Sequence, residues 1–206
     1  MPEVNADRTQ WVLLEESIKN CKQCGLYETR RNVVIGRGES TAGILMIGEG
    51  PGENEDRQGI PFVGQAGKLL DSALKGLRFA PDSYYIANIV KCRPPQNRAP
   101  SDDEADACLP FLRQQLRLIK PKIIVCLGGV AVRHIIGKDY KITRIRGEWI
   151  DRKGWWIMPT FHPAALLRDE DKKIDMWQDL KKVCQKYNEL KGELKSDADV
   201  WNNKAD

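Results

Sequence analysis

Short apolar runs alternate with longer amphipathic segments along this chain. Four runs, at residues 43–48, 84–90, 122–127 and 155–160, carry apolar side chains at most positions. Runs of this length are typical of strands buried on both faces, and the segments between them have the spacing of helices. The pattern predicts a mostly parallel sheet with helices on both faces, in a single domain over residues 1–206.

The segments between the runs carry helix signals. Apolar residues recur at helical spacing over residues 9–20, and a capping box of Ser101 with Glu104 begins a later helix. A final amphipathic helix is expected over residues 169–191. The polar tail from about residue 192 is expected to be loose, because it offers little apolar surface to bury.

Composition places the chain among ordinary globular proteins. It has 206 residues, of which 41% are apolar and 30% charged, and a formal charge of +4. This excludes a long disordered or fibrous protein, and the small charge permits a nucleic-acid partner without arguing for one. No run approaches the roughly 18 apolar residues of a membrane span, and the N-terminus lacks the apolar core of a signal peptide. We therefore expect a cytoplasmic protein with no membrane partner.

Six cysteines need an explanation, because a domain of this size does not require disulfides. Cys126 lies in a predicted strand and Cys184 in a predicted helix, so both are expected to be small buried side chains. The other four lie in or beside irregular segments: Cys21, Cys24, Cys92 and Cys108. The two-residue gap in the first pair suits a metal centre, and a structural zinc, an iron–sulfur cluster or unrelated thiols all remain open. Four thiolate ligands leave no open position, so the centre would be structural.

The first predicted strand runs into a glycine-rich acidic loop. Gly48, Gly50 and Gly52 allow backbone to approach a ligand closely, although such a loop alone is a weak signal and can be merely a tight turn. Four carboxylates follow in the same loop: Glu49, Glu53, Glu55 and Asp56. Like charge would repel phosphate here, so we expect a neutral or cationic ligand.

Two further polar residues stand at the carboxyl ends of predicted strands. Asn88 closes one strand, where an unpaired amide costs about 1–3 kcal/mol, so it either bonds a neighbouring loop or reads the amide edge of a ligand. His162 follows another strand and precedes Pro163, and both a structural and a functional role are open. His134 lies in an apolar helix and is expected to be structural. Sites in such folds gather at the carboxyl ends of the strands.

Four segments together closely resemble the iron–sulfur uracil-DNA glycosylases known as family 4. They are Gly48–Asp56, Pro61–Gly64, Asn88–Pro95 and His162–Leu167, and they occur in the family's order. The cysteine spacing matches as well. The resemblance covers the chain from about Cys21 to the last helix and implies a three-layer α/β/α sandwich. It also implies a [4Fe-4S] cluster on the four cysteines Cys21, Cys24, Cys92 and Cys108.

The resemblance further implies a DNA repair enzyme that hydrolyses the N-glycosidic bond of uracil and leaves an abasic site. The target base must first be flipped out of the duplex into a pocket. Phe62 would stack on the flipped ring, and Asn88 would accept from N3–H and donate to O4. Glu55 would lie beside C5, where a thymine methyl would clash.

The same resemblance assigns the catalytic groups. His162 would donate a hydrogen bond to O2 of the departing uracil, assisted by backbone N–H groups near Glu49 and Gly50. Glu49 is the candidate for orienting water and for stabilising the cationic sugar.

Contacts to DNA are expected beyond the pocket. Leu166 or Leu167 could enter the gap that the flipped base leaves. Four basic residues are candidates for phosphate contacts, with a plain solvated surface as the alternative: Lys91, Arg93, Arg98 and Arg168. We expect the protein to act on uracil-containing DNA as a monomer.

Two other functions compete with this interpretation. A non-catalytic nucleic-acid-binding module stabilised by a metal would explain the cysteines but would leave Glu49, Glu55, Asn88 and His162 without a role. A nucleotide-binding transferase would need a loop that cradles phosphate, which the acidic first loop opposes.

Overall fold

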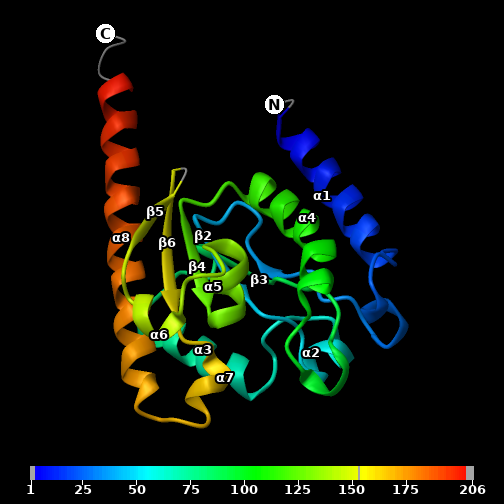
Figure 1. Ribbon diagram of the computed structural model, residues 1–206. Coiled ribbons are helices and arrows are strands. Elements are labelled where there is room, and N and C mark those ends of the chain that lie inside the picture. The colour runs from blue at the N-terminus through cyan, green and yellow to red at the C-terminus, as the bar shows by residue number, and fades with distance from the viewer. Residues whose placement is uncertain (1–2, 153, 203–206) are drawn as a thin grey trace.

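The computed structural model describes residues 3–152 and 154–202, with side chains for residues 8–152 and 154–192. A six-stranded sheet lies at its centre, in the order β1-β3-β2-β4-β6-β5 (Figure 1). The strands are β1 (Arg37–Gly38), β2 (Ile44–Gly48), β3 (Tyr84–Asn88), β4 (Ile123–Leu127), β5 (Ile150–Arg152) and β6 (Trp155–Thr160). The four inner strands run parallel and the two edge strands antiparallel. The predicted mostly parallel sheet is confirmed.

Helices cover both faces of this sheet. They are α1 (Glu3–Lys19), α2 (Glu53–Gln58), α3 (Gln65–Gly76), α4 (Asp102–Ile119), α5 (Gly129–Ile135), α6 (Ile142–Ile145), α7 (Pro163–Leu166) and α8 (Lys172–Asn202), with 3₁₀ turns η1 (Gly25–Glu28) and η2 (Pro95–Asn97). In Figure 1, α1 and α4 lie together on one side of the sheet and α8 on the other. The α/β/α sandwich is therefore confirmed.

The inner strands are apolar at consecutive positions because both of their faces are covered. In β2, Leu45 and Ile47 belong to the apolar cluster shared with α1, α4 and α5, whereas Ile44 and Met46 belong to the cluster shared with α3 and α8. All five residues of β2 are buried. This is the burial that an unbroken apolar run predicts for a parallel strand.

Several boundaries differ from the sequence-based expectations. Helix α1 begins at Glu3 rather than near residue 9. Helix α8 continues to Asn202, so the tail that was expected to be loose from about residue 192 is helical as far as that residue. Residues 203–206 lie outside those described. Low hydropathy does not preclude a helix, because residues such as glutamate, lysine and alanine favour helix without any burial.

The acidic loop after β2 is partly helical. Residues Glu53–Gln58 form α2, with Glu53, Glu55 and Asp56 in its first turn. Carboxylates at a helix N-terminus are favoured by the helix dipole, so the cluster of charges that suggested a ligand loop also begins a helix.

The connections place a crevice at the carboxyl ends of the strands. From β2 the chain passes through α3 to β3 on one side, and from β3 through α4 to β4 on the other side of β2. The strand order therefore reverses at β2, which is where ligands bind in open α/β sheets. Among the described helices, none combines the length and apolar character that crossing a membrane requires.

Candidate active site

A cavity of about 410 Å³ opens at the carboxyl ends of the strands, and we call it the carboxyl-end cavity. Its lining includes the six residues that sequence analysis placed in a base-binding and catalytic site: Glu49, Gly50, Glu55, Phe62, Asn88 and His162. They come from the ends of β2, β3 and β6, from the first turn of α2 and from the turn before α3. The structure thus brings these residues together, while their individual roles remain predictions.

Asn88 presents an unpaired acceptor to this cavity. It is the last residue of β3, in register with Gly48 of β2, and only 2% of its surface is exposed. Its Oδ1 has no hydrogen-bond partner among the described residues. A Cβ on Gly48 would lie 2.4 Å from this Oδ1 and 2.7 Å from the Phe62 ring, so only glycine leaves room for both. A buried acceptor left open in this way suits a ligand that carries an N–H donor.

Phe62 is held in a strained backbone conformation beside the cavity. Its φ is 56°, which is unusual for a bulky residue, and its side chain is buried. Gly67 in α3 packs so close to the backbone of Phe62 that a Cβ there would lie 1.8 Å from the carbonyl oxygen. The Phe62 ring lies 5.6 Å from the His162 ring, centroid to centroid, at an angle of 32°. Packing therefore fixes an aromatic face before any ligand arrives.

His162 is set up as a neutral hydrogen-bond donor. Its Nδ1 accepts from the backbone N–H of Ala164 at 3.1 Å, which leaves the ring proton on Nε2. Burial lowers the pKa of His162 to about 4, against an opposing effect of the Glu55 carboxylate. The imidazole is therefore uncharged at neutral pH, and its Nε2–H is available to a ligand oxygen.

The two carboxylates of the cavity have different surroundings. Glu49 has no hydrogen-bond or ion-pair partner in the described part of the chain, and burial raises its pKa. Glu55 is anchored, because its Oε1 accepts from the backbone N–H groups of Val63 at 2.9 Å and Gly64 at 2.8 Å. Glu49 is thus free to bind water or substrate, whereas Glu55 also holds the turn that carries Phe62.

Two of the residues predicted to contact DNA are buried. Lys91 has 1% of its surface exposed, and its Nζ donates to the carbonyl oxygen of Asn88 at 2.9 Å and to Oε1 of Gln115 at 2.6 Å. Its assignment to phosphate is therefore wrong in this structure. Leu166 does not fit a DNA wedge either, because this last residue of α7 is fully buried, whereas Leu167 is 48% exposed.

The remaining basic candidates differ in how freely they can reach a phosphate. Arg93 donates to Oδ1 of Asn97 at 2.8 Å and also faces Glu53, and Arg98 pairs with Glu104 at 2.6 Å. Arg168 lines the carboxyl-end cavity, is exposed, and has no side-chain partner among the described residues. Of the four, Arg168 is the one best placed for a phosphate contact.

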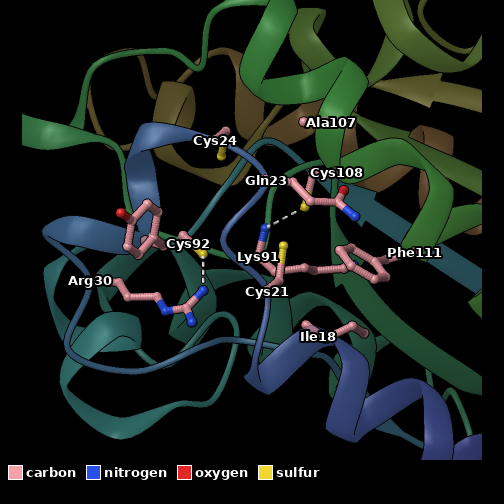
Figure 2. A pocket seen from close by; sticks show the side chains of 11 residues that line it. Ile18, Cys21, Gln23, Cys24, Arg30, Lys91, Cys92, Ala107, Cys108 and Phe111 are labelled. Carbon is pink, nitrogen blue, oxygen red and sulfur yellow. Dashed lines mark hydrogen bonds between the residues drawn. The ribbon is translucent and has the colours of Figure 1, made fainter.

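The four candidate ligand cysteines line a second hollow, the cysteine pocket, between α1, α4 and the loop after β3. Figure 2 shows their sulfur atoms turned toward a shared space. Sγ of Cys92 accepts from Arg30 Nη1 at 3.1 Å, and Sγ of Cys108 from the backbone N–H of Lys91 at 3.3 Å. Burial raises the pKa of Cys92, and that of Cys108 to about 11.

Two other findings bear on the cysteines. Cys126 is fully buried in β4 and Cys184 is partly buried in α8, in agreement with setting both aside. In the described residues, no three histidine, cysteine, aspartate or glutamate side chains are grouped closely enough to hold a single metal ion.

Sequence reasoning missed several supporting residues. Arg30 carried no periodic or motif signal, although it binds Cys92. Asp56 was counted only as a loop charge, yet it is 2% exposed and accepts from the backbone N–H groups of Arg31 and Asn32. A carboxylate followed three residues later by glycine at the end of a short helix gives little warning of such a role.

Comparisons with known proteins agree with the geometry. Residues 35–181 match the model of the Uracil DNA glycosylase superfamily. The chain is 44% identical over 164 residues to a type-4 uracil-DNA glycosylase of Thermotoga maritima, covering 79% of this chain and 85% of that protein. It is 43% identical over 179 residues to one of Sulfurisphaera tokodaii, covering 82% and 81%. The chain therefore belongs to the uracil-DNA glycosylase superfamily and, within it, to the type-4 uracil-DNA glycosylases.

Proposed function

We propose that this protein is a DNA repair glycosylase that takes uracil out of the DNA stack and hydrolyses its N-glycosidic bond. The products are free uracil and an abasic site. One observation carries the proposal: the buried, unpaired Oδ1 of Asn88 faces a cavity that also holds Phe62 and His162.

Asn88 gives the cavity its preference for uracil. Its Oδ1 accepts from N3–H of the base and its amide nitrogen donates to O4. Cytosine carries an acceptor at N3 and a donor at C4, so it leaves both partners unpaired, and each buried unpaired group costs about 1–3 kcal/mol. Such a mismatch can discriminate between bases by several orders of magnitude.

Glu55 excludes thymine in this proposal. Its carboxylate lies beside C5 of the base, where uracil has a hydrogen and thymine a methyl group. Two backbone N–H groups anchor its Oε1, so the carboxylate cannot swing aside to admit the methyl. Phe62 stacks on the same ring from a backbone that packing has already fixed.

Bond cleavage places negative charge on the departing uracil and positive charge on the sugar. The Nε2–H of neutral His162 donates to O2 of the base and stabilises that negative charge, with backbone N–H groups near Gly50 assisting. The unpaired Glu49 carboxylate orients the attacking water and stabilises the cationic sugar.

We further propose that Cys21, Cys24, Cys92 and Cys108 hold a [4Fe-4S] cluster. The donor set is four thiols, and two of them already accept hydrogen bonds that favour thiolate. When bound, the cluster supplies a structural link among α1, α4 and the loop after β3.

The cluster is tested on purified protein by iron, sulfide and zinc analysis. We expect about four irons per chain and the broad visible absorbance of an iron–sulfur centre. Stoichiometric zinc without iron would refute the proposed cluster but would leave the proposed glycosylase function standing.

Leu167 and Arg168 are proposed to face DNA, the first entering the duplex and the second binding phosphate. The protein is proposed to act as a monomer. The free thiols suit a reducing compartment, so a cytoplasmic location is proposed. Light scattering of the protein with and without DNA tests the monomer.

The decisive experiment uses oligonucleotides of one sequence that contain uracil, cytosine or thymine at one position. After incubation with the protein, hot alkali cleaves the strand wherever the base has been removed. We expect breakage at uracil only, in single-turnover reactions. Binding to the uracil duplex without breakage would instead support a non-catalytic nucleic-acid-binding module.

A further inference from the structure

Lys91 is the largest fully buried side chain that carries a charge. A buried ammonium is costly unless it is fully hydrogen-bonded, and lysine is seldom found in such a position. Two of its three N–H donors have acceptors here, the carbonyl oxygen of Asn88 and Oε1 of Gln115. The partners of this residue therefore explain why the protein keeps a charge in its interior.

The carbonyl bound by Lys91 lies at a gap in the sheet. The backbone groups of Tyr84 point toward β1, since the N–H of Glu39 donates to its carbonyl at 3.2 Å. Alternate residues of a strand point the same way, so the carbonyl of Asn88 also faces that side. However, β1 pairs with β3 only as far as Ile86. The ammonium of Lys91 therefore supplies the hydrogen-bond donor that a longer β1 would have offered to this carbonyl.

Gln115 extends this bridge to the chain that precedes β1. It lies on α4 and is completely buried, and its Nε2 donates to the carbonyl of Ile35 at 3.0 Å. In addition, the N–H of Val34 donates to the carbonyl of Lys91 at 2.8 Å. Two side chains thus fill the gap between residues 34–35 and the end of β3.

The opposite side of Asn88 is held by β2. The N–H of Ile89 donates to the carbonyl of Gly48 at 3.0 Å, and that of Val90 to the carbonyl of Glu49 at 3.2 Å. With Lys91 on the outer side, the backbone of Asn88 is fixed from both directions. Its carboxamide, whose Oδ1 makes no bond within the described protein, depends on this backbone for its orientation.

We propose that Lys91 is a positioning residue for uracil recognition, which holds the main chain of Asn88 from the open side of β3 so that the carboxamide faces the base. The inference rests on the proposed function. Lys91 acts through Asn88 and contacts neither the base nor the sugar. A displacement of about 1 Å at a recognition group is enough to slow catalysis substantially, so a side chain outside the cavity can have a large effect.

The test compares Lys91→Met with the parent protein. Methionine has nearly the same volume but cannot donate, so the carbonyl of Asn88 loses its partner. We expect the single-turnover rate on uracil DNA to fall at least about tenfold, with affinity for an undamaged duplex unchanged. Because Lys91 also lines the cysteine pocket, the iron content of each variant is measured and rates are compared per iron-loaded chain. Arg152→Met is the matched control, because Arg152 also donates to main-chain carbonyls, those of Ile135 and Ile136, but away from the cavity. It should keep the parent rate.

A double-mutant cycle separates positioning from a general structural role. If Lys91 acts through Asn88, then Lys91→Met should change the rate less than about twofold once Asn88→Ala is present. An equal loss in both backgrounds would overturn the inference. So would a Lys91→Met protein that is as fast as the parent.

A second variant covers the case in which Lys91→Met does not fold or does not bind the cluster. Gln115→Met leaves Lys91 in place and removes one of its two acceptors. We expect a smaller loss, about threefold or more, which again disappears in the Asn88→Ala background. A full parent rate for Gln115→Met would then overturn the inference. A parent protein that is inactive on uracil DNA would instead refute the proposed function.

Discussion

The two hollows beside the loop after β3 are built in opposite ways. In the carboxyl-end cavity, Oδ1 of Asn88 and the carboxylate of Glu49 have no partner among the described residues, and Phe62 has a positive φ. In the cysteine pocket, Sγ of Cys92 and Sγ of Cys108 both accept hydrogen bonds. The carboxyl-end cavity thus keeps polar groups without hydrogen-bond partners, whereas two of the sulfur atoms in the cysteine pocket already have them.

This difference distinguishes groups that act on a ligand from groups that stabilise the fold. Unpaired buried groups and backbone strain each reduce stability, so they persist where a ligand completes them. Groups that already have partners hold the chain in place instead. On this argument, changes in the carboxyl-end cavity should affect the rate more than the fold. Changes around it should affect the fold more than the rate, except at Lys91 and Gln115, which are proposed to act on the rate through Asn88.

The largest effect is expected for Asn88→Ala. The variant loses the only group placed to read N3–H and O4, so its rate on uracil should fall at least about a hundredfold while its melting temperature stays close to that of the parent. Single-turnover kinetics and thermal unfolding measure the two quantities. Cys126→Ala, buried in β4 away from the cavity, is the control and should stay active. Equal losses in the two variants would break the comparison.

Glu49→Gln should have the next largest effect and should change the pH profile. In the proposed mechanism Glu49 acts as the anion. Burial raises its pKa, so the parent rate should decline on acidification at a pH above the usual 4.5 of glutamate. The variant should be slower by about ten- to a hundredfold and should lack this decline, retaining only a fall near the pKa of His162, which is about 4. A decline that persists unchanged in Glu49→Gln would exclude this role.

Leu166 and Leu167 are adjacent but should respond in different ways. Leu167 is exposed beside the cavity, so Leu167→Ala should slow uracil removal from duplex DNA by about tenfold and leave removal from single strands unchanged. Leu166 is fully buried, so Leu166→Ala should instead reduce the free energy of unfolding by about 2–5 kcal/mol. Denaturant titration and parallel assays on both substrates distinguish them. If Leu166→Ala instead slowed removal from duplex DNA and Leu167→Ala lost stability, Leu166 would be the residue that enters DNA.

Acid should destabilise the parent protein partly through His162. The folded pKa of about 4 lies below the ordinary value of 6.5, so the unfolded state binds more protons between these values. The contribution of His162 to stability is therefore complete above about pH 6.5 and is lost as the pH falls toward 4. Denaturant titrations at pH 7 and pH 4.5 should show a smaller loss for His162→Gln than for the parent. An equal loss would mean that other groups account for the acid sensitivity.

The smallest effect is expected for Arg168→Ala. Removing one phosphate contact should weaken binding to every duplex alike and reduce the slope of log affinity against log salt by about 1. Arg113→Ala is the control, because Arg113 is exposed on α4 and does not line the carboxyl-end cavity. Titrations at several salt concentrations should show an unchanged slope for the control. An equal decrease of the salt slope in both variants would mean that Arg168 makes no specific phosphate contact.

The sequence predicts the inner part of the fold better than its margins. The four inner strands were predicted because burial on both faces forces an apolar side chain at most positions. The edge strands β1 and β5 have two and three residues and are half-exposed, so they leave no such pattern. Helix α2 was missed because its six polar residues show only the charge preference of a first turn.

Site residues divide in a similar way. Glu49, Gly50, Asn88 and His162 were singled out at strand ends, where topology brings them together, whereas the roles of Phe62 and Glu55 came from the family resemblance. Lys91 was misplaced because a lysine between Val90 and Cys92 looks like any exposed charge, and its acceptor Gln115 comes from a distant helix. Leu166 had a usable signal, since it lies three residues after Pro163, and both side chains face inward from the same helical turn.

The register of Gly48 against Asn88 has a consequence for the fidelity of the enzyme. Adjacent strands lie about 4.8 Å apart in every sheet, so the location of the amide proposed to test each base is dictated by ladder geometry rather than by a loop. The residues proposed to grip DNA, in contrast, follow the last strand on a single helical turn. Heating should therefore loosen hold on the substrate well before it relaxes the choice of base.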